Sequence, residues 1–104
     1  MTMIDDDLKV QRFRVEGVAV VVVRGDVDTA AATSMRAAFD ALGSDEHVYV
    51  DCAAVGVIDS DGLASLCEVA QRNVAAGGPL HVHASTEVRR LVEIHDLEHL
   101  FIFD

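Results

Sequence analysis

The start of the chain alternates apolar and polar positions in the manner of β-strands. Residues 8–15 (LKVQRFRV) follow this pattern with one slip of register near Arg12, which is typical of an edge strand. Residues 18–24 are rich in valine, which favours a central strand covered on both faces. We therefore predict an antiparallel pair of strands joined by a turn at residues 16–17.

Three later segments have the periodicity of amphipathic helices. Residues 29–42 are rich in alanine and follow Asp28, a suitable N-cap residue. A second apolar stripe begins at Leu63, repeats at helical spacing and ends before Gly77. A third helix is expected after Ser85 as its N-cap, with an inward face of Val88, Leu91 and Val92.

Short apolar segments separate these helices. Residues 47–52, 80–84 and 100–103 are predicted strands, and residues 53–58 are predicted to form a loop before the second helix. The resulting order is β-β-α-β-α-β-α-β. Because strand–helix–strand crossovers are right-handed, this order predicts an α/β fold with a mostly parallel, mixed sheet of about five strands and three helices.

The composition fits one compact domain in solution. The chain has 104 residues, of which 51% are hydrophobic, and we expect a single domain over 1–104 with a flexible N-terminus at 1–7. The longest apolar run, 18–23, is far shorter than the ~20 residues of a membrane span. Three aspartates at 5–7 do not resemble a secretory signal. We expect a cytoplasmic protein without membrane contact.

The net charge restricts the partners. Eight basic residues oppose eighteen acidic ones, which gives a formal charge of −10. Such a chain repels phosphate backbones and anionic lipids, so nucleic acid is not an expected partner.

The segment Asp59-Ser60-Asp61-Gly62 places a serine at a loop-to-helix junction. Because serine is a preferred N-cap residue, an ordinary N-cap role for Ser60 is the favoured interpretation. The positive end of the helix would equally tolerate a phosphate on this serine. A phosphate adds about 1.5–2 negative charges, which beside Asp59 and Asp61 would change what the surface can bind. Phosphorylation of Ser60 is thus a second hypothesis.

A second acidic segment follows the predicted central strand. Asp26 and Asp28 come at its carboxyl end, the end at which open α/β sheets place their sites. If the neighbouring strands are parallel, Asp28 and Ser60 lie at the same edge of the sheet. Two acidic loops would then border one surface.

These segments together resemble the STAS domain, in the form used by bacterial anti-sigma-factor antagonists. The resemblance covers nearly the whole chain and is carried by a strand-Gly-x-x-Asp element at 20–28 and a strand-Asp-loop-Asp-Ser-x-Gly-Leu element at 48–63. The strand at 78–82 and the helix containing Val-Arg-Arg-Leu at 88–91 also fit. The combination is more specific than any one of these elements.

The resemblance implies a binding protein that is switched by phosphorylation. Proteins of this family bind an anti-sigma factor, which is a serine kinase of the histidine-kinase-like ATPase fold, and thereby release a sigma factor. The kinase would phosphorylate Ser60 and end binding, and a phosphatase would restore it. The resemblance implies no cofactor, and it assigns partner contacts to Asp26, Asp28, Asp59, Asp61, Gly62, Leu63 and Ser65.

The chain departs from the family pattern in two places. Asp61 stands where the family usually has serine or threonine. Its carboxylate would either slow phosphorylation of Ser60 or partly mimic the phosphorylated state. The final helix that many relatives carry is not expected after Asp104.

An enzymatic or metal-binding role has little support. His81 and His83 share one face of a predicted strand, and His95 and His99 have a spacing that can bind zinc on a helix. No glutamate directly follows His95, as metalloproteases require, and Gly-x-Ser-x-Gly is absent. We expect no catalytic residue and no metal site.

Two further readings remain open. Cys52 and Cys67 are either two apolar side chains or a redox pair, which would need Cα atoms within about 7 Å of each other. A STAS domain can also serve as the docking subunit of a transporter or a signalling complex. Sequence composition does not separate that role from sigma-factor regulation.

Overall fold

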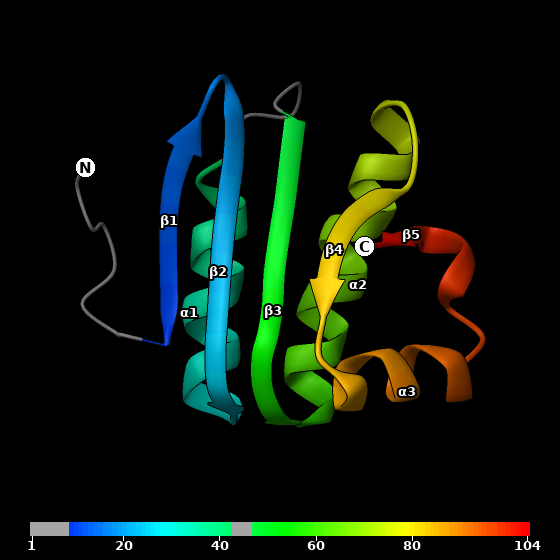
Figure 1. Cartoon of the computed structure of the whole chain (residues 1–104). Coiled ribbons are helices and arrows are strands. Elements are labelled where there is room, and N and C mark those ends of the chain that lie inside the picture. Colours follow the sequence, from blue (N-terminus) through cyan, green and yellow to red (C-terminus); the bar gives the residue numbers. More distant parts are fainter. Residues whose placement is uncertain (1–8, 43–46) are drawn as a thin grey trace.

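The computed structural model describes residues 9–42 and 47–104, and the N-terminus predicted to be flexible lies outside these ranges. Within them the chain forms one five-stranded sheet in the order β1-β2-β3-β4-β5 (Figure 1). The elements are β1 (Val10–Val15), β2 (Val18–Val27), α1 (Thr29–Asp40), β3 (His47–Ile58), α2 (Ser60–Ala76), β4 (Leu80–Ala84), α3 (Thr86–Ile94), the 3-10 helix η1 (Glu98–Leu100) and β5 (Phe101–Phe103). β1 is antiparallel to β2, and the other neighbours are parallel. The predicted fold class is confirmed.

The helices α1 and α2 lie side by side against one face of the sheet (Figure 1). The largest buried side chains of this layer include Phe39 and Met35 of α1 and Leu66 of α2. Burying a side chain of this size stabilises a fold by about 1.5–3 kcal/mol. The core therefore fixes both helices, and with them the residues at the start of α2.

The opposite face of the sheet carries no helix within the described residues (Figure 1). Ala19, Val21 and Val23 of β2 are buried, whereas the alternate valines of this strand are only half-buried. The prediction that β2 is covered on both faces was therefore wrong, and the middle position of the sheet belongs to β3. A valine-rich strand indicates burial in general but does not distinguish a helix-covered face from a partly open one.

The register of β1 also differs from the prediction. β1 pairs with β2 without interruption from Val10 opposite Val23 to Val15 opposite Val18, so the slip near Arg12 does not occur. Val10 is buried against the helices, while Val15 lies on the other face and is exposed. Apolar residues on both faces of one strand produced the apparent slip.

The predicted loop at 53–58 is a continuation of β3. β2 and β3 both extend, to Val27 and Ile58 respectively, and their pairing is interrupted by irregularities between Val22 and Arg24 and between Gly25 and Val27. Such irregularities break the two-residue period on which strand prediction rests. The extension matters because it determines where the site residues begin.

The predicted helix caps at Asp28 and Ser85 are confirmed. The Asp28 side chain accepts a hydrogen bond of 2.9 Å from the backbone N–H of Ala31. Ser85 Oγ accepts one of 3.2 Å from the N–H of Val88. In the described ranges, no helix has both the length and the apolar character needed to cross a membrane.

Candidate functional site

The two acidic segments meet at one edge of the sheet, as predicted. β2 and β3 are parallel and end together, with Val27 paired to Ile58. The backbone N–H of Asp59 donates to the Val27 carbonyl at 3.0 Å. Asp28 and Asp59 therefore follow adjacent strand ends, and each caps a helix that starts there.

The N-cap of α2 is Asp59 and not Ser60, which corrects the sequence-based prediction. Asp59 has an extended backbone, and its Oδ1 accepts a hydrogen bond of 2.9 Å from the N–H of Gly62. Aspartate and serine are equally good caps, so the sequence alone could not place the boundary between them. Ser60 becomes the first residue of the helix.

The Ser60 side chain is therefore free for another role. It is exposed, and its hydroxyl makes no side-chain hydrogen bond to any of the residues that the structure describes. The first turn of α2 also has backbone N–H groups that lack partners within the helix. An exposed hydroxyl at the positive end of a helix is well placed to carry an anionic modification.

Gly62 lets the start of α2 sit directly on the strand ends. A Cβ atom at this position would lie 2.6 Å from Val27 Cγ1 and 2.9 Å from Ile58 Cγ1. Contacts this short do not occur between real side chains, so any larger residue would push the helix away. The glycine of the Asp-Ser-x-Gly element thus sets the position of Ser60.

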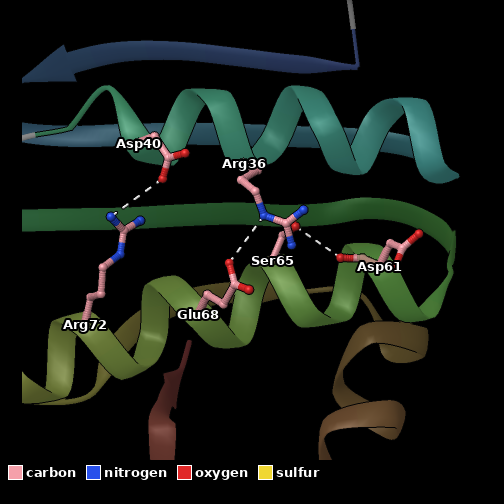
Figure 2. Close-up of polar contacts among 6 residues, drawn as sticks. All are labelled: Arg36, Asp40, Asp61, Ser65, Glu68 and Arg72. Carbon is pink, nitrogen blue, oxygen red and sulfur yellow. Dashed lines mark hydrogen bonds and ion pairs between the residues drawn. The ribbon is translucent and has the colours of Figure 1, made fainter.

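Two residues predicted to contact a partner are buried. Gly62 is buried against the strands, and Ser65 is only 2% exposed. Ser65 Oγ donates to the Asp61 carbonyl at 3.1 Å (Figure 2). Their burial does not fit a direct contact with a partner, whereas Leu63 is half-buried and Asp61 is exposed.

Ion pairs connect α2 to α1 along the exposed side of the helix layer (Figure 2). Arg36 Nε lies 3.3 Å from Glu68 Oε2, and Arg72 Nη1 lies 3.8 Å from Asp40 Oδ1. Pairs with such exposed side chains contribute about 0–1 kcal/mol each. They help to hold α2 in line with α1, while the buried core supplies most of the stability.

The edge of the sheet beside Ser60 is acidic. The pKa of Asp28 is lowered, chiefly by the hydrogen bond from the Ala31 N–H and also by the charge of Lys9. Asp28 therefore stays ionised at neutral pH. Together with the exposed Asp26 and Asp61 and with the half-buried Asp59, it gives this edge a negative field.

His95 and His99 do not lie together on one helix, as their spacing would allow. α3 ends at Ile94, so His95 caps the helix while His99 lies in η1. His81 and His83 are exposed on β4. Over residues 9–42 and 47–104, no group of three or more histidine, cysteine, aspartate or glutamate side chains could hold a metal ion.

Both cysteines are free thiols in the structure. Burial raises the pKa of Cys52 to about 12, with a further contribution from Asp51, and burial also raises the pKa of Cys67. Thiol–disulfide chemistry proceeds through the thiolate, which these shifts disfavour. A redox pair at these positions remains a prediction that the local environment does not favour.

The comparison with protein families identifies the fold. A family model described as "Mlab, STAS domain" matches residues 11–102. The match covers most of the chain, and the chain therefore belongs to the STAS domain family. No curated protein sequence matches it.

Solved structures of anti-sigma factor antagonists share this fold. A protein from Thermotoga maritima proposed to be such an antagonist has a TM-score of 0.76 and 18% identity, over 91% of this chain and 86% of that one. An anti-sigma factor antagonist from Mycobacterium paratuberculosis has a TM-score of 0.75 and 23% identity, over 98% and 89% of the two chains. SpoIIAA in its unphosphorylated form has a TM-score of 0.69 and 15% identity, over 89% and 86%.

Proposed function

We propose that this chain is an anti-sigma-factor antagonist of the bacterial cytoplasm. In its unphosphorylated form it binds a serine-kinase anti-sigma factor and releases a sigma factor. Phosphorylation of Ser60 ends the binding, and a phosphatase reverses it. The chain itself acts as a binding module without catalytic residues, metal or cofactor.

One observation carries this proposal: Ser60 is exposed at the start of α2 and takes no part in capping the helix. A serine with a structural role would cap the helix or bond to a neighbouring residue, and the Ser60 hydroxyl does neither among the residues that the structure describes. Its position between the strand ends that carry Asp28 and Asp59 is the one that the family resemblance assigns to the phosphorylated serine. The fold shared with anti-sigma factor antagonists, including SpoIIAA in an unphosphorylated form, supports the same role.

The expected effect of phosphorylation is on binding rather than on folding. The helix N-terminus stabilises an added negative charge, so a phosphate at Ser60 does not disrupt α2. The same charge adds to those of Asp59 and Asp61 and raises the cost of removing water from this surface. A partner that fits the unmodified edge would therefore be released.

The test combines phosphorylation with binding. The purified chain is incubated with ATP and each serine-kinase anti-sigma factor of its host, and peptide mass spectrometry locates any added phosphate. We expect phosphate on Ser60, continued binding of Ser60→Ala in the presence of ATP, and weak binding of Ser60→Glu. Because Ser60 is not the cap, Ser60→Ala should change the free energy of unfolding by no more than about 0.5 kcal/mol.

Other outcomes would change the conclusion. Equal binding of Ser60→Ala and Ser60→Glu would contradict the switch. Tight binding to a kinase without phosphorylation would indicate a constitutive antagonist. If no kinase binds and no phosphate appears, the chain is a docking subunit of another complex.

The variant Asp61→Ser distinguishes the two possible effects of the unusual aspartate, slower phosphorylation of Ser60 and mimicry of the phosphorylated state. If Asp61 slows phosphorylation by repulsion, the variant is phosphorylated faster with unchanged affinity for the kinase. If Asp61 mimics the phosphorylated state, the unphosphorylated variant binds the kinase more tightly. Asp61 is exposed and only its backbone carbonyl bonds to Ser65, so the substitution leaves that bond in place.

A further inference from the structure

A cleft of about 500 Å³ opens between α2 and α3, directly beside Ser60. Figure 1 shows α3 next to the first turns of α2, at the end of the sheet where β3 ends. The apolar lining consists of Ile58, Leu63, Ala64, Cys67, Leu91 and Leu97. Asp59, Ser60 and His95 supply its polar groups.

The cleft walls are partly exposed although they are apolar. Leu63, Leu91 and Leu97 are half-buried against the core, and Ala64 is exposed. Apolar surface of this kind, bordered by polar residues, is typical of a site that another molecule covers.

The charges around the cleft indicate what kind of molecule that is. Its described lining contains no lysine or arginine, while Asp59 lies in the wall and Asp61 follows Ser60 on the helix. Asp28, at the neighbouring strand end, is also ionised, with the charge of Lys9 close to it, so the acidic border rests chiefly on Asp59 and Asp61. The cleft thus combines an apolar interior with an acidic border.

We propose that this cleft receives an apolar side chain of the kinase anti-sigma factor, from a segment in which basic residues flank that side chain. The inference rests on the proposed function and adds an anchoring pocket to it. A cleft of this volume is within the range of about 300–1,000 Å³ found for small-molecule pockets, so it has room for one apolar side chain. An apolar anchor in a pocket surrounded by complementary charge is the arrangement in which most interface energy concentrates.

The same arrangement couples docking to phosphorylation. Ser60 is part of the cleft wall, so a phosphate on Ser60 stands at the edge of the pocket. The anchor can enter only if this edge loses water, which is costly for a phosphate. Phosphorylation therefore hinders entry of the anchoring side chain into the cleft, in addition to its effect on the surface around Ser60.

The reactivity of the Cys67 thiol measures whether the cleft is covered, since Cys67 lines the cleft two helical turns beyond Ser60. Cys52 is buried in the core and serves as an internal reference. We measure alkylation of each thiol by N-ethylmaleimide, with and without a saturating amount of the kinase anti-sigma factor that the chain binds. We expect Cys67 to react at least about tenfold more slowly in the complex. An unchanged rate would overturn the inference, because a partner seated on Ser60 alone leaves the cleft open.

A matched pair of variants tests the same point by affinity. Ala64→Phe fills the cleft, whereas Ala75→Phe makes the same change at an exposed position near the other end of α2. We expect Ala64→Phe to weaken kinase binding by about tenfold or more, which corresponds to about 1.4 kcal/mol. Ala75→Phe should stay within about twofold of the original chain.

The outcomes separate this inference from the proposed function. If the original chain and Ala64→Phe bind the kinase equally, the cleft is not used, while the Ser60 switch stands. If no kinase binds the original chain, the proposed function fails and the anchoring pocket fails with it. Circular dichroism of both phenylalanine variants shows that a loss of binding is not a loss of folding.

Discussion

Asp59 and Ser60 are adjacent, and the side chain of either residue suits a helix N-cap. The structure gives the cap to Asp59, whose Oδ1 bonds to the Gly62 N–H. The shift by one residue leaves Ser60 exposed and without a structural task. From the sequence we gave Ser60 the capping role, because the choice between two good caps depends on where β3 ends.

The hydrogen bond between Tyr49 and Asp104 can be tested by titration of the tyrosine. Its hydroxyl donates to Asp104 Oδ2 at 2.6 Å, and this bond, together with burial and the charge of Asp104, raises the pKa of Tyr49 to about 12. The chain has one tyrosine and no tryptophan, so ultraviolet absorbance reports this group alone. We expect a titration midpoint near pH 12 in the folded chain, and a midpoint closer to 10.0 in Asp104→Ala.

The sign of the stability effect follows from the raised pKa. The folded state favours the protonated phenol, so the contribution of Tyr49 is fully present below the ordinary pKa of 10.0 and is lost as the pH rises toward about 12. Since the bond is exposed, Asp104→Ala should lower the free energy of unfolding at pH 7 by less than about 1 kcal/mol. Tyr49→Phe is the control that removes both the absorbance signal and this pH dependence. A midpoint near 10.0 in the unmodified chain would show that the bond does not form.

At the scale of elements, the helices were easier to predict than the strand ends. The three helices follow from apolar periodicity and from cap residues such as Asp28 and Ser85, both of which the structure confirms. The last part of β3 was missed because its pairing with β2 is irregular. The cleft beside Ser60 was also missed, because Leu91 and Leu97 reach it from a distant part of the chain. Local patterns do not show such contacts.

Gly62→Ala tests how closely α2 sits on the strand ends. Alanine is favoured over glycine in a helix by about 1 kcal/mol, but its Cβ would lie 2.6 Å from a methyl group of the buried Val27. Overpacking of this kind costs about 1–3 kcal/mol, and the stiff χ1 of valine limits relief. The cost of overpacking exceeds or cancels the gain in helix propensity, and we expect the free energy of unfolding to fall by up to about 2 kcal/mol in denaturant titrations. Binding to the proposed kinase partner should weaken as well, since the start of α2 is displaced.

Gly78→Ala is the matched control for this substitution. A Cβ at Gly78 meets no atom within 4 Å, and its backbone is not in the left-handed region. We expect this variant to unfold at nearly the same denaturant concentration as the original chain. If Gly62→Ala were more stable than the original chain by the full helix preference of about 1 kcal/mol, the strand ends would move without cost, and close packing would not be what positions Ser60.

At the scale of the whole molecule, the site depends on the topology of the sheet. Because β2 and β3 are parallel, Asp28 and Asp59 meet at one edge although they are far apart in sequence. This juxtaposition could be predicted, since strand–helix–strand crossovers make neighbouring strands parallel. The turn at Glu16, between the antiparallel β1 and β2, lies at the opposite end of the sheet. The net charge of −10 belongs to the entire chain, and the topology places part of it beside Ser60.

This placement predicts how docking depends on salt. A basic partner segment is attracted over distances comparable to the Debye length, which falls from about 30 Å at 0.01 M to about 3 Å at 1 M ionic strength. We expect the association rate with the proposed kinase partner to fall by about tenfold or more over this range, with a smaller change in the dissociation rate. Stopped-flow measurements with the unphosphorylated chain provide both rates.

Two variants of equal net charge separate local from overall attraction. Asp28→Asn removes a charge beside the site and retains a side-chain oxygen that can cap α1. Glu16→Gln removes one at the opposite end of the sheet. If the acidic edge steers the partner, Asp28→Asn should slow association at low salt several times more than Glu16→Gln, and the difference should disappear at high salt. Equal slowing by both variants would mean that only the net charge matters, in which case the aspartates around Ser60 would not guide a basic segment toward the cleft.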